Sequence, residues 1–550
     1  MIGWSSPRFA EPLQLIRGQG DPLDLASTNE RLYNTVFPGF NNTVRYIGVY
    51  SALCWMAMQV QRHLHSAQGL TNSAAEALQL QAMEKMELAL LWASGLEAEL
   101  SGKTRQFPGD GTAQRLTMDQ WAMDARLMSA PQYLPSLTSG LKFLNDEWIC
   151  TDRGAALGNA FGDKLGPPQS HRWLRDPACV QATAAQIGRA SAALSVLERP
   201  SAEERSAFLA SFFPADPRSM GAIADPRDRQ RWETLHLVLH ALAQLSVGSG
   251  AQNEQAIRAA MTSGLTRSSL GVVRPGLERC HAIWAVLQVR ILQRMALETL
   301  LGFVISWVRV HSRTNRSPTD CAREIGALLS DSFAQVGLSK VSDLRARIAK
   351  SQRGHATLSL AATVTGKDAP SVFFYLTQLR ELGAVPGPEG NGAWLRLTLT
   401  ALAVCAVETG NFLEAGHEHA NALNSISAER TSLTSLHASF VRLQDKPLTD
   451  WARELLLNWV FSRYDEVATQ RAVARNGKLR FDFIQGEYGL ESGPPRNGAF
   501  RAVWQTDKLY TALVLLQQCG LIIGSEAGWR LTAAGRHRVR DYQELPARRK

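Results

Sequence analysis

The chain has 550 residues, of which 45% are hydrophobic and 20% are charged, proportions that are ordinary for a globular protein. This supply of apolar residues is ample for several cores, so the chain needs no disulfide staples, and its length allows roughly three to four domains. The formal net charge of +9 favours an acidic partner, with nucleic acid first and an anionic membrane surface second.

Seven cysteines are scattered singly along the chain, and no two have CxxC spacing. We therefore expect small core residues in a reducing compartment. The first residues, 1–14, lack the basic head and apolar run of a signal peptide. The most hydrophobic stretch, 295–308, contains Glu298 and is too short to span a bilayer. We predict a cytoplasmic protein with no contact to a membrane.

The first sharp feature along the chain is the tripeptide 37–39, Phe-Pro-Gly. It is a turn signal, because proline presets φ and glycine permits a positive φ. Arg45 and Tyr46 then lie in the first turn of a predicted apolar helix that carries Trp55. These two residues could meet a phosphate or a base. The alternative, which we favour, is a buried helix start in which Arg45 pairs with a nearby acid.

The turn at 37–39, the stretch 43–46 with its Arg-Tyr pair, and the aromatic helix with Trp55 resemble the start of an uncharacterised bacterial family. Members of that family are found beside helicases and nucleases in anti-phage defence islands. The resemblance implies a bacterial genome-defence or mobile-element setting. It implies no catalytic residue.

Residues 1–168 are assigned to an amino-terminal helical domain, and residues 169–345 to a helical middle domain. Within the first, residues 132–161 are a candidate degenerate winged helix-turn-helix, a fold in which one helix enters the DNA major groove and a β-hairpin, the wing, touches the backbone. The pattern predicts a helix over 133–144 and a short strand over 147–150. The hairpin is compressed in this copy compared with two others farther along the chain.

The middle domain contains two histidines, His236 and His240, four residues apart on one face of a predicted helix. This is the spacing of a zinc half-site. No HExxH motif is present and no nearby cysteine or aspartate completes a ligand set, so we favour two histidines packed at a helix interface. The same argument applies to His417 and His419. We expect neither a metal ion nor another cofactor.

Residues 346–445 are predicted to form a winged helix-turn-helix domain with a following helix. Its first helix covers 358–364. Its second covers 370–382, where the opening proline is well tolerated in a first helical turn. The wing is predicted to be a hairpin of residues 384–385 and 394–397.

Residues 446–550 combine a long helix, a basic and aromatic strand, a second winged helix-turn-helix and a basic tail. A helix that ends at Gly520 is followed by a short apolar strand, a polar turn at 524–528 and a return strand over 529–531. Thr532 opens the last helix. Helix, glycine, strand, turn and strand is the order at the end of a winged helix-turn-helix.

The two winged helices form a remote internal repeat. In each copy, apolar residues three apart lead to a glycine, and the order Trp, Arg, Leu, Thr closes the wing. The recognition helices carry few charges on their expected exposed faces, with Arg380 in the middle copy and Lys508 in the last. These faces therefore suit protein contacts nearly as well as DNA contacts.

The best basic and aromatic cluster lies between the two copies, where residues 478–483 alternate as a strand. Such a cluster can track a phosphate backbone or stack a base. The alternative is a half-buried edge strand with its basic side chains in water. With the last winged helix and the tail, the cluster makes the end of the chain the predicted nucleic-acid face. The predicted contacts are Arg471, Arg475, Lys478, Arg480, Lys508, Arg530, Arg536 and Arg538.

We therefore predict a mainly α, multi-domain protein with two winged helix-turn-helix modules and a candidate third. The predicted function is a non-catalytic DNA-binding or adaptor subunit of a bacterial anti-phage defence or DNA-transaction complex. The predicted partners are double-stranded DNA and other proteins of the same operon, such as a helicase or nuclease. One alternative is a protein-protein scaffold that uses its winged helices for subunit contacts. A second is a nuclease with an unrecognised metal site.

Overall fold

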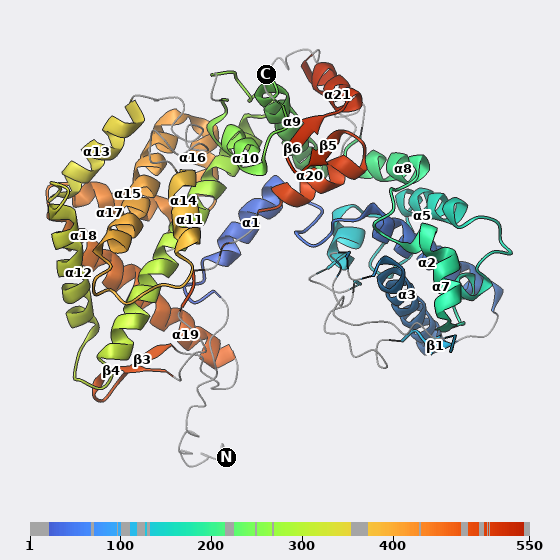
Figure 1. The fold of residues 1–550 in the computed structure, drawn as a ribbon, viewed down its shortest axis with the longest axis horizontal. Coiled ribbons are helices and arrows are strands. Elements are labelled where there is room, and N and C mark those ends of the chain that lie inside the picture. The colour runs from blue at the N-terminus through green and yellow to red at the C-terminus, as the bar shows by residue number, and fades with distance from the viewer. Residues whose placement is uncertain are drawn as a thin grey trace, which may run out of the picture. The chain divides into compact units, whose positions relative to one another are not determined.

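The structure is a computed structural model, drawn in Figure 1. The residues it describes are 21–67, 71–95, 97–98, 100, 111–117, 127–128, 132–214, 225–247, 250–266, 269–353, 372–427, 431–474, 482–493, 500–502, 504 and 507–543. These residues are mainly helical, and their few strands form short two-stranded sheets. The predicted mainly α fold class is confirmed.

The chain forms two compact units, each built from separated stretches. Unit 1 takes the described parts of 1–32, 259–271 and 281–505, and unit 2 takes those of 33–258, 272–280 and 506–550. The units differ from the four contiguous segments predicted, because the chain leaves unit 2 and returns to it at its end. Three helices have residues in both units: α1 (Ala26–Val36), α10 (Glu254–Ser263) and α11 (Glu278–Val310).

Unit 1 is built around α11 and a set of shorter helices. It contains α12 (Pro318–Ala334), α13 (Val341–Arg353), α14 (Val372–Leu382), α15 (Gly392–Ala415), α16 (His417–Asn424), α17 (Leu433–Arg442), α18 (Leu448–Glu454), a π-helical segment (Leu455–Phe461), α19 (Ser462–Ala474), and the hairpin of β3 (Phe483–Gly486) and β4 (Gly489–Ser492). The run from α18 to α19 confirms the long helix predicted in this region. α15 packs against α12, α13, α14 and α17 and is central to the unit.

The predicted wing of the middle winged helix is wrong. Residues 394–397 belong to α15 rather than to a strand. Leu395, Leu399 and Leu402 are all fully buried, and this spacing of three or four residues places them on one helical face. Ala384 instead makes an isolated antiparallel bridge with Arg501. The second helix is present as α14, whereas the predicted first helix at 358–364 lies outside the described residues.

Two helices, α11 and α15, are long and apolar enough to cross a membrane by length and composition. Of their most apolar windows, 94% and 61% respectively are buried inside the protein. Burial of this kind is typical of core helices.

Unit 2 consists of a larger helical part and the end of the chain. Its elements are α2 (Ile47–Ser66), α3 (Asn72–Ser94), β1 (Gln114–Arg115), a π-helical turn (Ser136–Gly140), α5 (Asp152–Leu165), α6 (Arg172–Arg175), β2 (Gln181–Ala182), α7 (Ala184–Leu194), α8 (Ala202–Phe212), α9 (Pro226–Leu245), α20 (Leu509–Gln518), β5 (Ile522–Ser525), β6 (Gly528–Leu531) and α21 (Ala533–Gln543). Serine and threonine caps begin many of these helices, and Thr183 and Ser201 form full capping boxes at α7 and α8.

The core of this larger part forms around α2, which is buried along most of its length. Tyr50 on α2 meets the rings of Tyr133, Phe143 and Phe208, with centroids 5.1–5.8 Å apart. α5 crosses α2 at Gly158, which has no side chain to hold the helices apart. The candidate winged helix at 132–161 is reduced to the short π-helical turn, one bridge between Leu144 and Cys150, and α5.

Candidate nucleic-acid interface

The element order predicted around Gly520 is confirmed. α20 ends at Gln518, and Gly520 follows its C-cap with a φ of +77°, in the left-handed region that glycine adopts without strain. β5 and β6 then pair in register from Ile522 with Leu531 to Ser525 with Gly528. The Thr532 hydroxyl accepts a hydrogen bond from the Gly535 amide at 3.1 Å and so caps α21.

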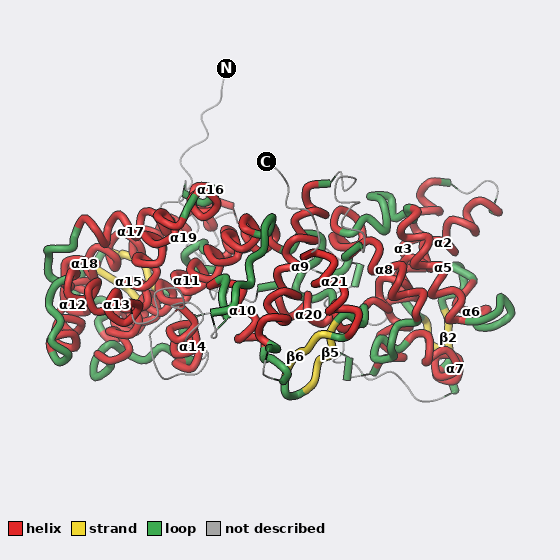
Figure 2. Tube along the Cα trace, turned by 90° about the horizontal axis from the view of Figure 1, so that it is seen from above, coloured by secondary structure: helices red, strands yellow, loops and turns green. Residues whose placement is uncertain are grey.

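Residues from a distant part of the chain complete this arrangement. Gln252 pairs with Trp529 of β6, and each backbone amide donates to the other's carbonyl at 2.8 and 2.7 Å. α9 packs against both β6 and α21. In Figure 2, the two strands lie close to α20. We call α9, residues 252–258, α20, β5, β6 and α21 together the C-terminal module. No local signal marks residues 226–258 as part of it, so sequence reasoning missed them.

A buried ion pair joins the two parts of the C-terminal module. The Arg258 guanidinium donates to both carboxylate oxygens of Asp507, with Nε–Oδ2 at 2.7 Å and Nη2–Oδ1 at 3.0 Å. Their side chains are 3% and 1% exposed. Burial lowers the pKa of Arg258, but the charges and hydrogen bonds of Asp507 and Glu254 outweigh it and raise the pKa above its ordinary value. Asp507 also accepts from the Leu509 amide at the start of α20.

The segment 37–47 covers part of the expected recognition face of α20, whereas Tyr510 and Gln517 remain exposed. The Gln518 side chain accepts a hydrogen bond from the Ile47 amide at 2.9 Å and donates to the Arg45 carbonyl. The Arg45 guanidinium lies over the Tyr510 ring, 5.0 Å from its centroid. Arg45 and Tyr46 precede α2 rather than lying in its first turn. Base reading in a major groove by α20 would therefore depend on Tyr510 and Gln517, because Gln518 is held by the segment 37–47.

Lys508 is buried, which corrects its prediction as a nucleic-acid contact. Its ammonium donates to the Phe37 carbonyl at 2.9 Å and lies near the rings of Tyr33 and Phe40. Burial, with smaller effects of Arg227 and Arg231, lowers its pKa from 10.5 to about 7. A phosphate cannot reach this ammonium in the folded arrangement.

The lowered pKa of Lys508 gives a testable pH dependence. Between pH 7 and 10.5 the unfolded chain keeps this proton while the folded chain has lost it, so the unfolded state binds more protons and stability rises with pH. Relative to Lys508→Met, the wild-type protein should gain on the order of 1 kcal/mol between about pH 7 and 9. Urea unfolding of both proteins at the two pH values measures this difference. Parallel shifts in both proteins would contradict it.

The other predicted nucleic-acid contacts differ in their exposure and in the part of the protein to which they belong. Arg530 on β6 and Arg536 on α21 are exposed. Arg538 is buried, donating to the Pro214 carbonyl at 2.6 Å with its guanidinium over the Phe213 ring, so its prediction as a phosphate contact is also corrected. Arg471 belongs to unit 1, where its guanidinium lies 3.8 Å from an Asp24 carboxylate oxygen. Arg475, Lys478 and Arg480 lie outside the described residues.

The histidine pair on α9 is packed at a helix interface, as favoured from the sequence. The rings of His236 and His240 lie 4.7 and 5.2 Å from that of Tyr542 on α21, and the Trp232 ring lies tilted against that of His236 at 4.0 Å. Burial lowers the pKa of both histidines, that of His240 to about 4. Among the described residues, no three His, Cys, Asp or Glu side chains are grouped to hold a metal ion.

Comparison with protein-family models, with curated proteins and with solved structures gives no match to this chain.

Proposed function

We propose that this chain is a non-catalytic, nucleic-acid-binding adaptor subunit of a bacterial DNA-transaction or anti-phage defence complex. The observation that carries the proposal is the C-terminal module, with Arg530 exposed on its hairpin and Arg536 and Arg540 exposed on α21. A winged helix-turn-helix has the order helix, strand, two helices and hairpin. α9, Gln252, α10, α20 and β5–β6 follow that order, with unit 1 inserted before α20.

The exposed charges of the module suit the backbone of a duplex rather than its bases. Arg530 stands on the hairpin, and Arg536 and Arg540 stand on α21, all exposed to solvent. Phosphate contacts of this kind fix position on DNA and carry no sequence information directly. With the α20 face partly covered, we expect binding that depends strongly on salt and weakly on sequence.

A double substitution of the exposed arginines tests this mode of binding. Arg530→Glu with Arg536→Glu should weaken binding to a duplex by roughly tenfold at about 50 mM salt and reduce the slope of log K against log salt by about 1.8. Fluorescence anisotropy with a labelled duplex of arbitrary sequence, titrated at several salt concentrations, gives both quantities.

The matched control is Arg189→Glu on α7, an exposed arginine of unit 2 outside the module. It should leave affinity and salt slope close to those of the wild-type protein. Failure of the wild-type protein to bind duplex DNA at low salt would end the DNA proposal. Equal losses in the control and the double variant would show that only overall charge matters.

The coverage of α20 favours a second function, a protein-protein scaffold. Segment 37–47 already uses the recognition surface for contacts within unit 2, as protein-binding winged helices do with their partners. Co-expression with the products of neighbouring genes, followed by size-exclusion chromatography, should then give a complex of defined mass. A chain that elutes alone in every combination would contradict this function. Because no three His, Cys, Asp or Glu side chains are grouped among the described residues, no observation favours the nuclease alternative.

A further inference from the structure

Two cysteines that are far apart in the sequence meet in unit 2. Cys54 lies within α2, and Cys150 lies just before α5. The Cys150 thiol donates a hydrogen bond to the Cys54 carbonyl, with Sγ–O at 3.1 Å, and it also interacts with the Cys54 thiol. Cys54 is fully buried, whereas Cys150 is half-buried. Both are free thiols, so the pair is poised to form a bond that is not yet made.

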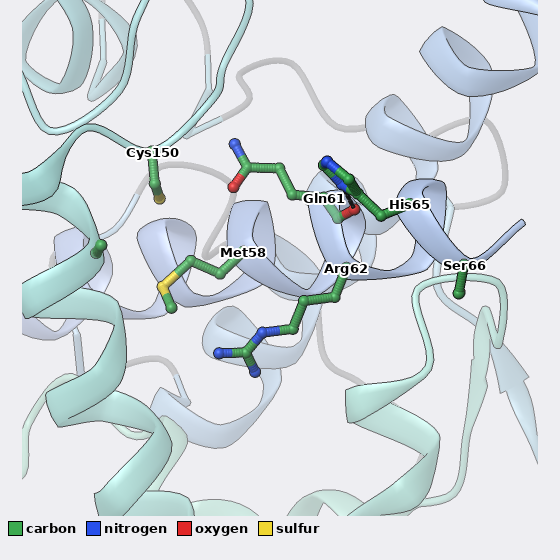
Figure 3. Close-up of a pocket in the computed structure, with 7 residues that line it drawn as sticks. Met58, Gln61, Arg62, His65, Ser66 and Cys150 are labelled. Carbon is green, nitrogen blue, oxygen red and sulfur yellow. Dashed lines mark hydrogen bonds between the residues drawn. The ribbon is translucent and has the colours of Figure 1, made fainter.

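A cavity of about 560 Å³ gives access to Cys150 from one side. Met58, Gln61, Arg62, His65 and Ser66 of α2 line it, together with Cys150 and Ala155. Figure 3 shows the Cys150 sulfur pointing toward Met58, with the Arg62 side chain extending toward the helix that carries Ala155. The cavity is large enough for a small peptide-like reagent to reach the sulfur.

The mouth of this cavity carries the positive charge of Arg62. Arg62 and His65 are both exposed there. The positive charge of Arg62 adds to burial in lowering the pKa of nearby Arg175. Within the part of the chain that the structure describes, no carboxylate forms an ion pair with Arg62. A reagent with carboxylate groups therefore fits this mouth better than a neutral or cationic one.

We propose that Cys150 and Cys54 form a thiol-oxidation site that reacts with anionic, low-molecular-weight disulfides. The Cys150 thiolate attacks one sulfur of the reagent, a protein–reagent S–S bond forms, and the reagent's own S–S bond breaks. The first half of the reagent leaves as a thiolate and takes up a proton. The Cys54 sulfur then attacks Cys150 Sγ, its proton passes to the departing sulfur, and the second half of the reagent leaves as a thiol. The chain is oxidised by two electrons, and the reagent is reduced to two thiols.

The order of the two attacks follows from the surroundings of the thiols. Burial and the interaction with Cys150 raise the pKa of Cys54 well above its ordinary value, so few Cys54 thiolates are present at neutral pH. Cys54 is also out of reach of solvent. Cys150 lines the cavity and is therefore the residue that attacks the reagent first, while Cys54 resolves the mixed disulfide.

The first experiment uses the full-length, reduced protein and oxidised glutathione as the probe. After incubation, acid quenching and proteolysis without reductant, mass spectrometry should identify a peptide pair linked through Cys54 and Cys150. Dithiothreitol should remove the link. Cys179 is half-buried like Cys150, and its thiol contacts the Gln181 carbonyl at 3.7 Å, so it is the internal comparison. Equal modification of Cys150 and Cys179 with no linked peptide would overturn the proposal.

Variants separate the chemistry from the binding of the reagent. Cys54→Ala should stop the reaction at a mixed disulfide on Cys150, and Cys179→Ser should leave formation of the linked peptide unchanged. Arg62→Ala should slow oxidation by glutathione disulfide several-fold but leave oxidation by the neutral bis(2-hydroxyethyl) disulfide unchanged. Equal rates for Arg62→Ala and wild type with glutathione disulfide would overturn the anionic specificity. None of these readouts involves DNA, so their outcome is independent of the proposed function.

Discussion

Replacing Asp507 with asparagine is expected to lower the free energy of unfolding by about 3 kcal/mol. The substitution Asp507→Asn would keep the shape of the side chain but remove the negative charge that faces the buried Arg258 guanidinium. Glu254 would remain as the second partner of Arg258, but its side chain is 29% exposed, so the loss of the fully buried carboxylate still leaves the buried cation poorly compensated. Urea unfolding followed by circular dichroism measures the loss.

Asp541→Asn is the matched control for this substitution. Asp541 pairs with His537 on α21, and the two side chains are 34% and 66% exposed. Exposed pairs contribute little, so this variant should change the free energy of unfolding by less than about 0.5 kcal/mol. If both asparagine variants behaved alike, the pair between Arg258 and Asp507 would not hold the C-terminal module together.

Gly158→Ala is expected to destabilise the protein by about 2–3 kcal/mol. A Cβ atom at Gly158 would lie 2.7 Å from Met58 Sδ and 2.9 Å from the backbone nitrogen of Trp55. Because one of these atoms belongs to the backbone of α2, side-chain rotation alone cannot relieve the crowding, and α5 must move away. Thermal and urea unfolding measure the effect.

Gly188→Ala makes the same chemical change as Gly158→Ala but is expected to stabilise the protein. Gly188 lies inside α7, and a Cβ atom there would meet nothing within 4 Å. Alanine favours a helix over glycine, so this variant should be more stable by about 0.5–1 kcal/mol. A loss of stability in both variants would mean that the close approach of α5 and α2 is not the cause.

Local sequence signals were sufficient to predict the β-hairpin at 522–531, but they led to a wrong prediction of a hairpin at 384–397. Gly520 and Thr532 require little beyond their own neighbours to end one helix and cap the next, and both act as expected. The order Trp, Arg, Leu, Thr from Trp394 is compatible with a strand and with a helix alike. The spacing of buried leucines, which continues through Leu402, favours the helix. The resemblance of this stretch to the C-terminal hairpin drew attention away from that spacing.

The candidate interface could be predicted only in part, because burial is decided by distant segments. Arg530 and Arg536 are exposed, as their prediction as contacts requires. Lys508 and Arg538 have the same residue chemistry, but the carbonyls of Phe37 and Pro214 hold them inside unit 2. Nothing in the local sequence distinguishes the exposed pair, Arg530 and Arg536, from the buried pair, Lys508 and Arg538. The meeting of Cys54 with Cys150 is hidden for the same reason, since no short motif links the two residues.

The separated stretches of unit 2 have a consequence for synthesis on the ribosome. Residue 506 follows residue 258 by 248 positions, and translation of this interval takes roughly 12–50 s at about 5–20 residues per second. Until α20 emerges, Arg258 has no Asp507 to neutralise it and the Phe37 carbonyl has no lysine partner. Unit 2 can therefore complete its folding only after α20, β5, β6 and α21 have been synthesised, so its first part waits while unit 1 is made.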